Sequence, residues 1–292
     1  MAGKKNVPAV QEEEDNKQVA VHAGGSVPGI TKIEDEDLLE ELEGVAGAGA
    51  SDRVEDRGTP LLYVAQKSSP QIDKKQDKFI KDLEAGDLFN NLTGEFFKAE
   101  GEDNGLEILP CFFRVGYVEW APDRGGFVAR HPRDINIQAM GCKMWVNPNK
   151  KDAKPRGDMF ELPNGNMLVE THDYYCVLPH NYSTIIIPMS STNLAASRQM
   201  QSFIDARKAE VGGKFIVLPA FWTRFNLQTV YRDEGEYNWY QMKPSVIGDN
   251  TDKRLRQFCK AFALACARNE IKASTPMGEH ADIVKDNTPD AI

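Results

Sequence analysis

The segment from Lys214 to Lys243 contains the side chains with the clearest chemical potential. Alternation along its first half places Phe221, Phe225 and Leu227 on one face of a strand. A four-residue turn over 233–236 returns the chain, so the opposite face of the hairpin collects aromatic and cationic side chains: Trp222, Arg224, Arg232, Tyr237, Trp239 and Lys243. Flat rings that stack on bases, next to cations that contact phosphates, are typical of sequence-tolerant binding to a single nucleic-acid strand.

Two arrangements of this hairpin are compatible with its pattern. The turn pairs Arg232 with Tyr237 and Val230 with Trp239, which leaves Trp222 and Trp239 exposed as a stacking platform. Aromatic residues on both faces also fit a sheet that is covered on both sides, in which both indoles are packed under a helix or a loop. A register slip of one residue would exchange the two faces. Both arrangements therefore remain open.

Two further groups of basic residues extend the candidate surface. A loop is expected to present cations around one indole: Lys143, Trp145, Lys150, Lys151, Lys154 and Arg156. The last predicted helix places Lys253, Arg256 and Lys260 along one edge at helical spacing. Each group taken alone also fits an ordinary solvated face.

The residues that are most suggestive of a metal site are His172, Cys176 and His180. Their spacing of four would bring them together on a helix, but the surrounding alternation predicts a strand. At about 3.3 Å per residue the two histidines would lie about 26 Å apart, which excludes one shared zinc ion. The sequence contains no glycine-rich phosphate loop, and its acid pairs lie in predicted exposed turns. We expect a protein without a metal, a cofactor or an enzymatic activity.

The elements that position these residues are mostly strands. Patterns predict strands over 106–120, 167–178 and 184–189, a helix that begins at Ser190 or Ser191 and ends at Gly212-Gly213, a long strand over 214–232 with a return over 237–243, and a final helix from about Asp252. That helix should bury Leu255, Phe258, Cys259, Phe262 and Cys266. The order predicts a mainly β protein with a few helices (α+β), built as an antiparallel β-barrel of the oligonucleotide-binding (OB) type with inserted loops.

Charge divides the chain into three parts. The net charge is −8 over residues 1–60, +1 over 61–270 and −2 over 271–292. We expect a disordered acidic N-terminal arm (1–60), a single β-rich nucleic-acid-binding domain (61–271) and a flexible acidic C-terminal tail (272–292). No segment approaches the roughly 20 apolar residues of a membrane span, and five widely spaced cysteines fit buried free thiols, so a cytoplasmic location without a membrane partner is expected.

Several blocks resemble a family of proteins encoded by tailed bacteriophages. The matching residues are Tyr63–Pro70, Gly86–Glu95, Ile108–Pro110, Tyr117–Trp120, Leu162–Asn166, Ser190–Thr192 and Asn238–Tyr240. The resemblance spans about 60–270, is associated with phage single-stranded DNA-binding proteins, and brings no established binding residues with it. Such proteins commonly end in an acidic tail that recruits replication enzymes. Here the tail ends in Ala291-Ile292 and lacks the aromatic terminus of several of them.

Taken together, these observations predict a phage protein that coats and protects single-stranded DNA during replication or recombination in the cytoplasm of the infected host. Its acidic tail is expected to contact phage or host replication proteins. The main alternative is a virion structural or scaffold protein, in which the exposed aromatic residues contact protein. An enzyme whose site has no recognisable motif is the third option. The salt dependence of binding distinguishes these first two functions. Binding through phosphate contacts weakens steeply as the salt concentration rises, whereas binding through an apolar interface does not.

Overall fold

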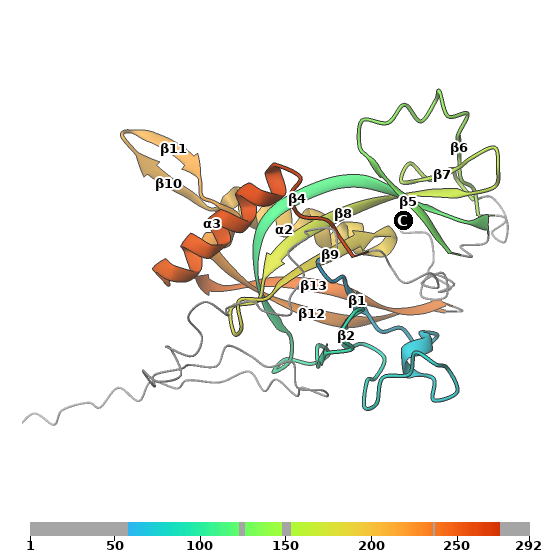
Figure 1. Cartoon of the computed structure of the whole chain (residues 1–292), viewed down its shortest axis with the longest axis horizontal. Helices are drawn as coiled ribbons and strands as arrows, with labels where there is room; N and C mark the ends of the chain where they lie inside the picture. The colour runs from blue at the N-terminus through green and yellow to red at the C-terminus, as the bar shows by residue number, and fades with distance from the viewer. Residues whose placement is uncertain (1–57, 123–125, 148–152, 236, 275–292) are drawn as a thin grey trace, which may run out of the picture.

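The computed structural model describes residues 58–122, 126–147, 153–235 and 237–274, which form a mainly β fold with two α-helices (Figure 1). The strands are β1 Leu62–Val64, β2 Leu88–Asn90, β3 Phe96–Phe97, β4 Leu106–Trp120, β5 Phe127–Pro132, β6 Lys143–Met144, β7 Met159–Glu161, β8 Met167–Val177, β9 Thr184–Ser190, β10 Lys208–Val211, β11 Lys214–Val217, β12 Thr223–Glu234 and β13 Tyr237–Asp249. The helices are α2 Leu194–Ala206 and α3 Lys253–Ala267, with short 3₁₀ turns η2 Pro70–Ile72, η4 Ser191–Asn193 and η5 Ala220–Trp222.

The largest sheet is antiparallel and curled (Figure 1). Its order is β13-β12-β4-β8-β7-β6, with β5 also paired to β4 and β9 also paired to β8. The two long strands β4 and β8 are therefore shared by two halves of the sheet. Strands β12, β13 and β9 complete one half, and β5, β7 and β6 complete the other. The predicted mainly β fold with an antiparallel sheet is confirmed, and the sheet is curled into a half-barrel.

The first half is a half-barrel that the segment of β1 extends toward closure. Leu61 forms a parallel bridge with Ile186 of β9, whose amide donates to the Pro60 carbonyl at 2.9 Å. On the other side, the Gln66 side chain satisfies the free edge of β13. Its Nε2 donates to the Tyr240 carbonyl at 2.9 Å, and its Oε1 accepts from the Tyr240 amide at 2.7 Å. One side-chain amide thus replaces a strand at this edge.

Two apolar cores lie on opposite faces of β4 and β8. The inner core includes Ile108, Tyr174, Phe225 and Met242, and α2 contributes Met200 to it. On the outer face, α3 packs on the sheet through the residues Leu255, Cys259, Phe262 and Cys266, against partners that include Leu109, Tyr175 and Val177. Both faces of these central strands are therefore covered, which explains the apolar runs Ile108–Phe113 in β4 and Tyr174–Val177 in β8. Of the residues predicted for the buried face of α3, Phe258 is an exception at 39% exposed.

Several predicted elements are confirmed with small changes in their bounds. Strand β4 covers the predicted range 106–120, and β8 and β9 follow their predictions within one residue. Asp252 caps α3 as expected, because its Oδ1 accepts from the amides of Arg254 at 2.8 Å and Leu255 at 3.1 Å. These elements have long periodic patterns or a clear capping residue.

The long strand predicted over 214–232 is wrong. The chain forms β11, breaks at Pro219, turns through η5 and only then enters β12. Pro219 has no amide hydrogen to donate and favours the first turn of a helix, so it interrupts the strand. The predicted helix also ends at Ala206 and not at Gly212-Gly213, because those glycines, with φ of +59° and +76°, form the tip of the separate β10–β11 hairpin.

The predicted turn of the β12–β13 hairpin is also wrong. Glu234 pairs with Tyr237, so the turn has two residues, and Gly235 supplies the positive φ of +74° that such a tight turn requires. Arg232 consequently faces Trp239 in place of Tyr237. The whole register moves by two residues, which keeps each side chain on its predicted face.

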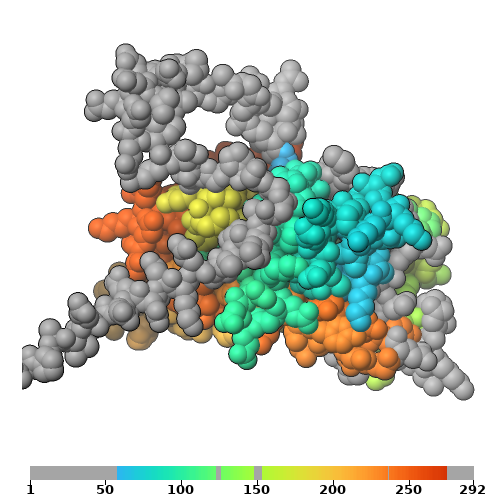
Figure 2. All heavy atoms as spheres, turned by 90° about the horizontal axis from the view of Figure 1, so that it is seen from below, coloured from blue at the N-terminus to red at the C-terminus, as the bar shows by residue number. Residues whose placement is uncertain are grey.

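The segment before β4 contributes a small three-stranded sheet, β1-β2-β3, with a core around Phe89 and Phe96. Figure 2 shows this segment beside β12 and β13 on the face seen from below. Within the described part of the chain, no helix is both long and apolar enough to cross a membrane. Most of the predicted acidic arm and nearly all of the predicted tail lie outside the described residues.

Candidate nucleic-acid interface

Trp239 lies in the hairpin but is not available for stacking. Its side chain is only 6% exposed, and its Nε1 has no hydrogen-bond partner among the described residues. A ring that is covered in this way cannot present a face to a base. The alternative left open by the sequence, packing under neighbouring structure, therefore holds for this residue.

Trp222 is exposed but lies far from Trp239. It belongs to η5, with 38% of its surface exposed, and it precedes Arg232, the cross-strand partner of Trp239, by ten residues. At about 3.3 Å per residue this corresponds to about 33 Å along β12. The predicted single platform of two indoles is wrong, because the strand that joins them separates them.

The hairpin cations differ in how far they are neutralised. Arg224 makes a two-pronged contact with Glu107 of β4, in which Nη2 donates to Oε2 at 2.7 Å. Arg232 donates to Gln241 Oε1 at 3.0 Å and keeps its charge at the exposed tip. Lys243 is exposed and Tyr237 is half-buried. Arg224 is therefore a weak candidate for a phosphate contact, since its charge is already compensated.

The predicted basic loop lies at the other end of the sheet. Lys143 and Lys154 are exposed, whereas Trp145 is partly buried against the core around Trp120. Arg156 donates to both oxygens of Asp158, at 3.0 and 2.6 Å, and to Ser191 Oγ at 3.3 Å. The two remaining predicted members of the group, Lys150 and Lys151, lie outside the described residues.

The strongest combination of aromatic and cationic groups is found on α3 and η5. The Arg256 guanidinium lies over the Trp222 ring, with Cζ 4.7 Å from the ring centroid. Lys253 and Lys260 are exposed on the same edge of the helix, at spacings of three and four residues from Arg256. We call these four residues the α3 surface. The helix sequence from 253 to 267 contains no acidic residue.

Local structure fixes the position of Trp222. Pro219 begins the 3₁₀ turn, and the Trp222 amide donates to its carbonyl at 2.9 Å. Buried Asn250 holds the other side, since its amide donates to the Trp222 carbonyl at 2.8 Å and its Nδ2 donates to the Phe221 carbonyl at 3.0 Å. The indole is therefore held on an ordered backbone, while its ring remains partly open to solvent.

Sequence reasoning identified the helix cations but did not connect them to Trp222. The spacing of Lys253, Arg256 and Lys260 and the absence of acids in the helix were visible signals. The contact itself joins residues 34 positions apart, and it depends on Asn250 placing η5 against the start of α3. No local pattern predicts such a contact.

The structure gives His172, Cys176 and His180 separate surroundings. His172 Nδ1 lies 2.6 Å from Ser197 Oγ, and its Nε2 lies 3.0 Å from Glu170 Oε1. Cys176 is buried in the inner core, where desolvation raises the pKa of its thiol well above the ordinary value. His180 lies at the surface, and partial desolvation lowers its pKa.

Comparison with known protein families identifies the family of this chain. The family model described as Pam3 phage gp34-like protein matches residues 37–272. The chain belongs to this family. The match is wider than the blocks noted in the sequence, because it starts within the acidic N-terminal segment at Asp37. It supports a phage-encoded protein. No curated protein matches the chain. No solved structure matches it either.

Proposed function

We propose that this phage-encoded protein binds single-stranded DNA through the α3 surface, in the cytoplasm of the infected host, during replication or recombination. The observation that carries the proposal is the exposed Trp222 ring beneath the Arg256 guanidinium, beside a helix with four cations and no acid. A half-exposed indole can stack on an unpaired base, and the adjacent cations can contact the phosphates on either side of that base.

The curled sheet supports this proposal at the level of architecture. The half-barrel of β13, β12, β4, β8 and β9, extended by the β1 segment, is consistent with a barrel of the OB type. Barrels of that type commonly bind oligonucleotides. The proposed interface differs from the expected one in its place, because it lies on the helix that covers the outer face of the sheet and not on the β12–β13 hairpin.

The test is titration of the full-length protein with a short oligothymidylate, followed by tryptophan fluorescence and anisotropy. Binding should quench the emission. Trp222→Ala should weaken binding by about 1–3 kcal/mol with little loss of stability, since the ring is exposed. Trp239→Ala should instead cost about 3–5 kcal/mol of folding free energy, with normal affinity in the folded fraction. Unchanged affinity of Trp222→Ala would contradict the proposal.

Salt dependence provides the matched control for the cations. Arg256→Ala should reduce the slope of log K against log salt by about one unit. Arg224→Ala should leave the slope unchanged, because Glu107 already neutralises that arginine. If the parent protein, Arg256→Ala and Arg224→Ala have equal slopes between about 50 and 200 mM salt, the α3 surface does not contact phosphates.

A second function is favoured by one separate observation. The β10–β11 hairpin exposes Phe215 at 74% and Val211 at 58%, the two highest values among the large apolar side chains of the described residues. Apolar surface of this kind often marks a contact with protein. The second candidate is therefore a structural or scaffold protein of the phage particle that binds other protein copies through this hairpin.

A further inference from the structure

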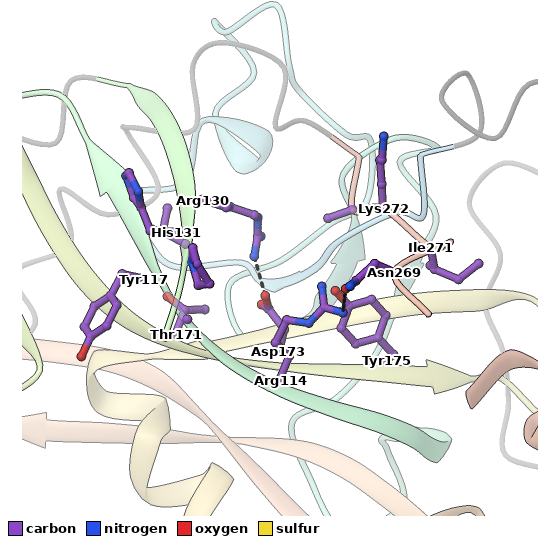
Figure 3. Close-up of a pocket in the computed structure, with 14 residues that line it drawn as sticks. Arg114, Tyr117, Arg130, His131, Thr171, Asp173, Tyr175, Asn269, Ile271 and Lys272 are labelled. Atoms are coloured by element: carbon purple, nitrogen blue, oxygen red, sulfur yellow. Dashed lines mark hydrogen bonds and ion pairs between the residues drawn. The ribbon is translucent and has the colours of Figure 1, made fainter. Parts of the chain in front are cut away.

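A cavity of about 440 Å³ lies between β4, β5, β8 and the segment that follows α3 (Figure 3). Its wall includes Arg114, Arg130, His131, Asp173, Tyr175 and Lys272. It is separate from the α3 surface. Trp222 lies near the start of the 15-residue helix, whereas Lys272 follows its end, and a helix of that length spans about 22 Å.

The cavity wall has an excess of positive charge. Arg114, Arg130 and Lys272 contribute three cations, and Asp173 is the one carboxylate among the lining residues. His131 contributes little to the balance, because its Nε2 is paired at 2.7 Å with Glu119 Oε2 behind the wall. The wall thus carries a net charge of about +2. Uncompensated cations in a partly buried site are unfavourable unless an anion joins them.

The first guanidinium, that of Arg114, is already positioned by the protein. Its Nη2 donates to the Cys266 carbonyl at 3.2 Å and to Asn269 Oδ1 at 2.7 Å, at the end of α3. Its Cζ also lies 5.5 Å from the ring centroids of both Phe112 and Tyr175. None of the ion pairs found among the described residues includes this arginine, and its charge acts on the cavity carboxylate Asp173 only at longer range.

The second guanidinium is held by the buried carboxylate. Arg130 Nη1 donates to Asp173 Oδ2 at 2.5 Å, and Figure 3 shows the two side chains meeting across the cavity. The pair is incompletely satisfied, because Arg130 Nε and Asp173 Oδ1 are buried without hydrogen-bond partners among the described residues. Asp173 therefore orients Arg130 through Nη1, and the buried pair keeps unsatisfied hydrogen-bonding groups beside the cavity.

We propose that this cavity binds a phosphate monoester. Two oriented guanidiniums can each contact phosphate oxygens, and exposed Lys272 adds a third positive charge to the wall. The net charge of about +2 matches a dianion of about −2 better than a carboxylate of −1. The Tyr175 ring and the apolar part of the wall offer contact to the organic portion, and the volume is within the range of small-ligand sites. The phosphate can come from a free nucleotide or from the 5′ end of a DNA strand.

The experiment is calorimetric titration of the full-length protein with inorganic phosphate, thymidine 5′-monophosphate and thymidine. Phosphate and the monophosphate should bind with one site per chain, and thymidine should not. Exposed Lys272→Ala should weaken both by about tenfold, and Arg114→Lys should weaken them while keeping the charge, because it loses the forked geometry. Lys75→Ala, an exposed lysine outside both the cavity and the candidate nucleic-acid surface, is the matched control and should bind normally. Absence of binding at millimolar concentrations, or equal binding by all variants, would overturn the proposal.

The two sources of phosphate are distinguished with short oligothymidylates that carry a 5′-phosphate or a 5′-hydroxyl. Tighter binding of the phosphorylated strand, reversed by inorganic phosphate and by Lys272→Ala, assigns the cavity to strand ends. Equal binding of both strands, with binding of the free monophosphate, assigns it to nucleotides. The hydroxyl-ended strand reports the α3 surface alone, so failure of the cavity proposal is separable from failure of the proposed function.

Discussion

Burial is the main influence on proton affinity at individual residues of this domain. Desolvation raises the pKa of the Cys266 thiol to about 11. It also raises the pKa of Asp173, although Arg130 and Arg114 act in the opposite direction. Because the thiolate is the reactive form of cysteine, the buried thiols are expected to be chemically inert at neutral pH. Their contribution is to packing, since Cys259 and Cys266 belong to the outer core.

The raised thiol pKa values predict a loss of stability in alkali. Above the ordinary pKa of 9.0, the unfolded chain releases a proton from Cys266 that the folded chain retains up to about pH 11. The contribution of this thiol to the free energy of unfolding should therefore be fully present below about pH 9. It should be lost as the pH rises to 11, by at most about 1.4 kcal/mol per pH unit for one thiol. Urea unfolding at several pH values measures this. A smaller decline is expected for Cys266→Ala, and no decline in the parent protein would contradict the prediction.

At the scale of elements, the β10–β11 hairpin differs from the rest of the sheet. It forms a separate two-stranded ladder, and such ladders are only marginally stable without further packing. Its base is fixed by the Leu218 amide, which donates to the Arg207 carbonyl at 2.8 Å, and by the ion pair of Arg207 with Asp249. The apolar tip remains exposed, so a binding partner would supply the packing that it lacks.

This arrangement predicts self-association through the hairpin. Phe215→Ser should shift the full-length protein toward the monomer in sedimentation velocity, because it removes the most exposed large apolar side chain of the described domain. Lys214→Ser, on the same hairpin, should have no effect. If Phe215→Ser weakens binding to DNA without changing the sedimentation, the hairpin contacts the strand and not a second copy.

At the scale of the whole molecule, the two ends of the domain lie together. The Thr59 amide donates to the Lys272 carbonyl at 3.0 Å, and the Ser274 amide donates to the Thr59 carbonyl at 2.8 Å. Both acidic ends of the sequence therefore continue from the same place, close to the end of α3. Along the sequence, the acidic charge is concentrated in residues 1–60 and 271–292, whereas residues 61–270 are almost neutral.

The position of the C-terminal end predicts competition between the acidic tail and DNA. Removal of residues 275–292 should tighten binding to oligothymidylate at low salt, because it removes four acids and one lysine that are tethered near the cationic helix. The difference should shrink as the Debye length falls from about 10 Å at 0.1 M to about 3 Å at 1 M salt. Equal affinities of the truncated and full-length proteins at low salt would exclude the tail from the mechanism.

The sequence by itself determined the class of the fold and its principal strands. The near-continuous apolar run from Leu106 to Trp120 predicted β4, and Asp252 marked the start of α3. These signals are local, because strand periodicity and helix capping act over a few neighbouring residues. The side-chain faces of residues 225–232 and 237–243 in the β12–β13 hairpin were also predictable, since a register error of two residues preserves the alternation.

Only the tertiary structure decided which indole is exposed and which cations act together. Trp222 and Trp239 have similar local patterns, yet one is covered and the other lies under Arg256 at the surface. Long-range contacts decide both properties: Asn250 holds η5 and with it Trp222, and Glu107 neutralises Arg224. Burial and charge neutralisation depend on segments that are distant in the sequence, so the pattern of one strand cannot determine them.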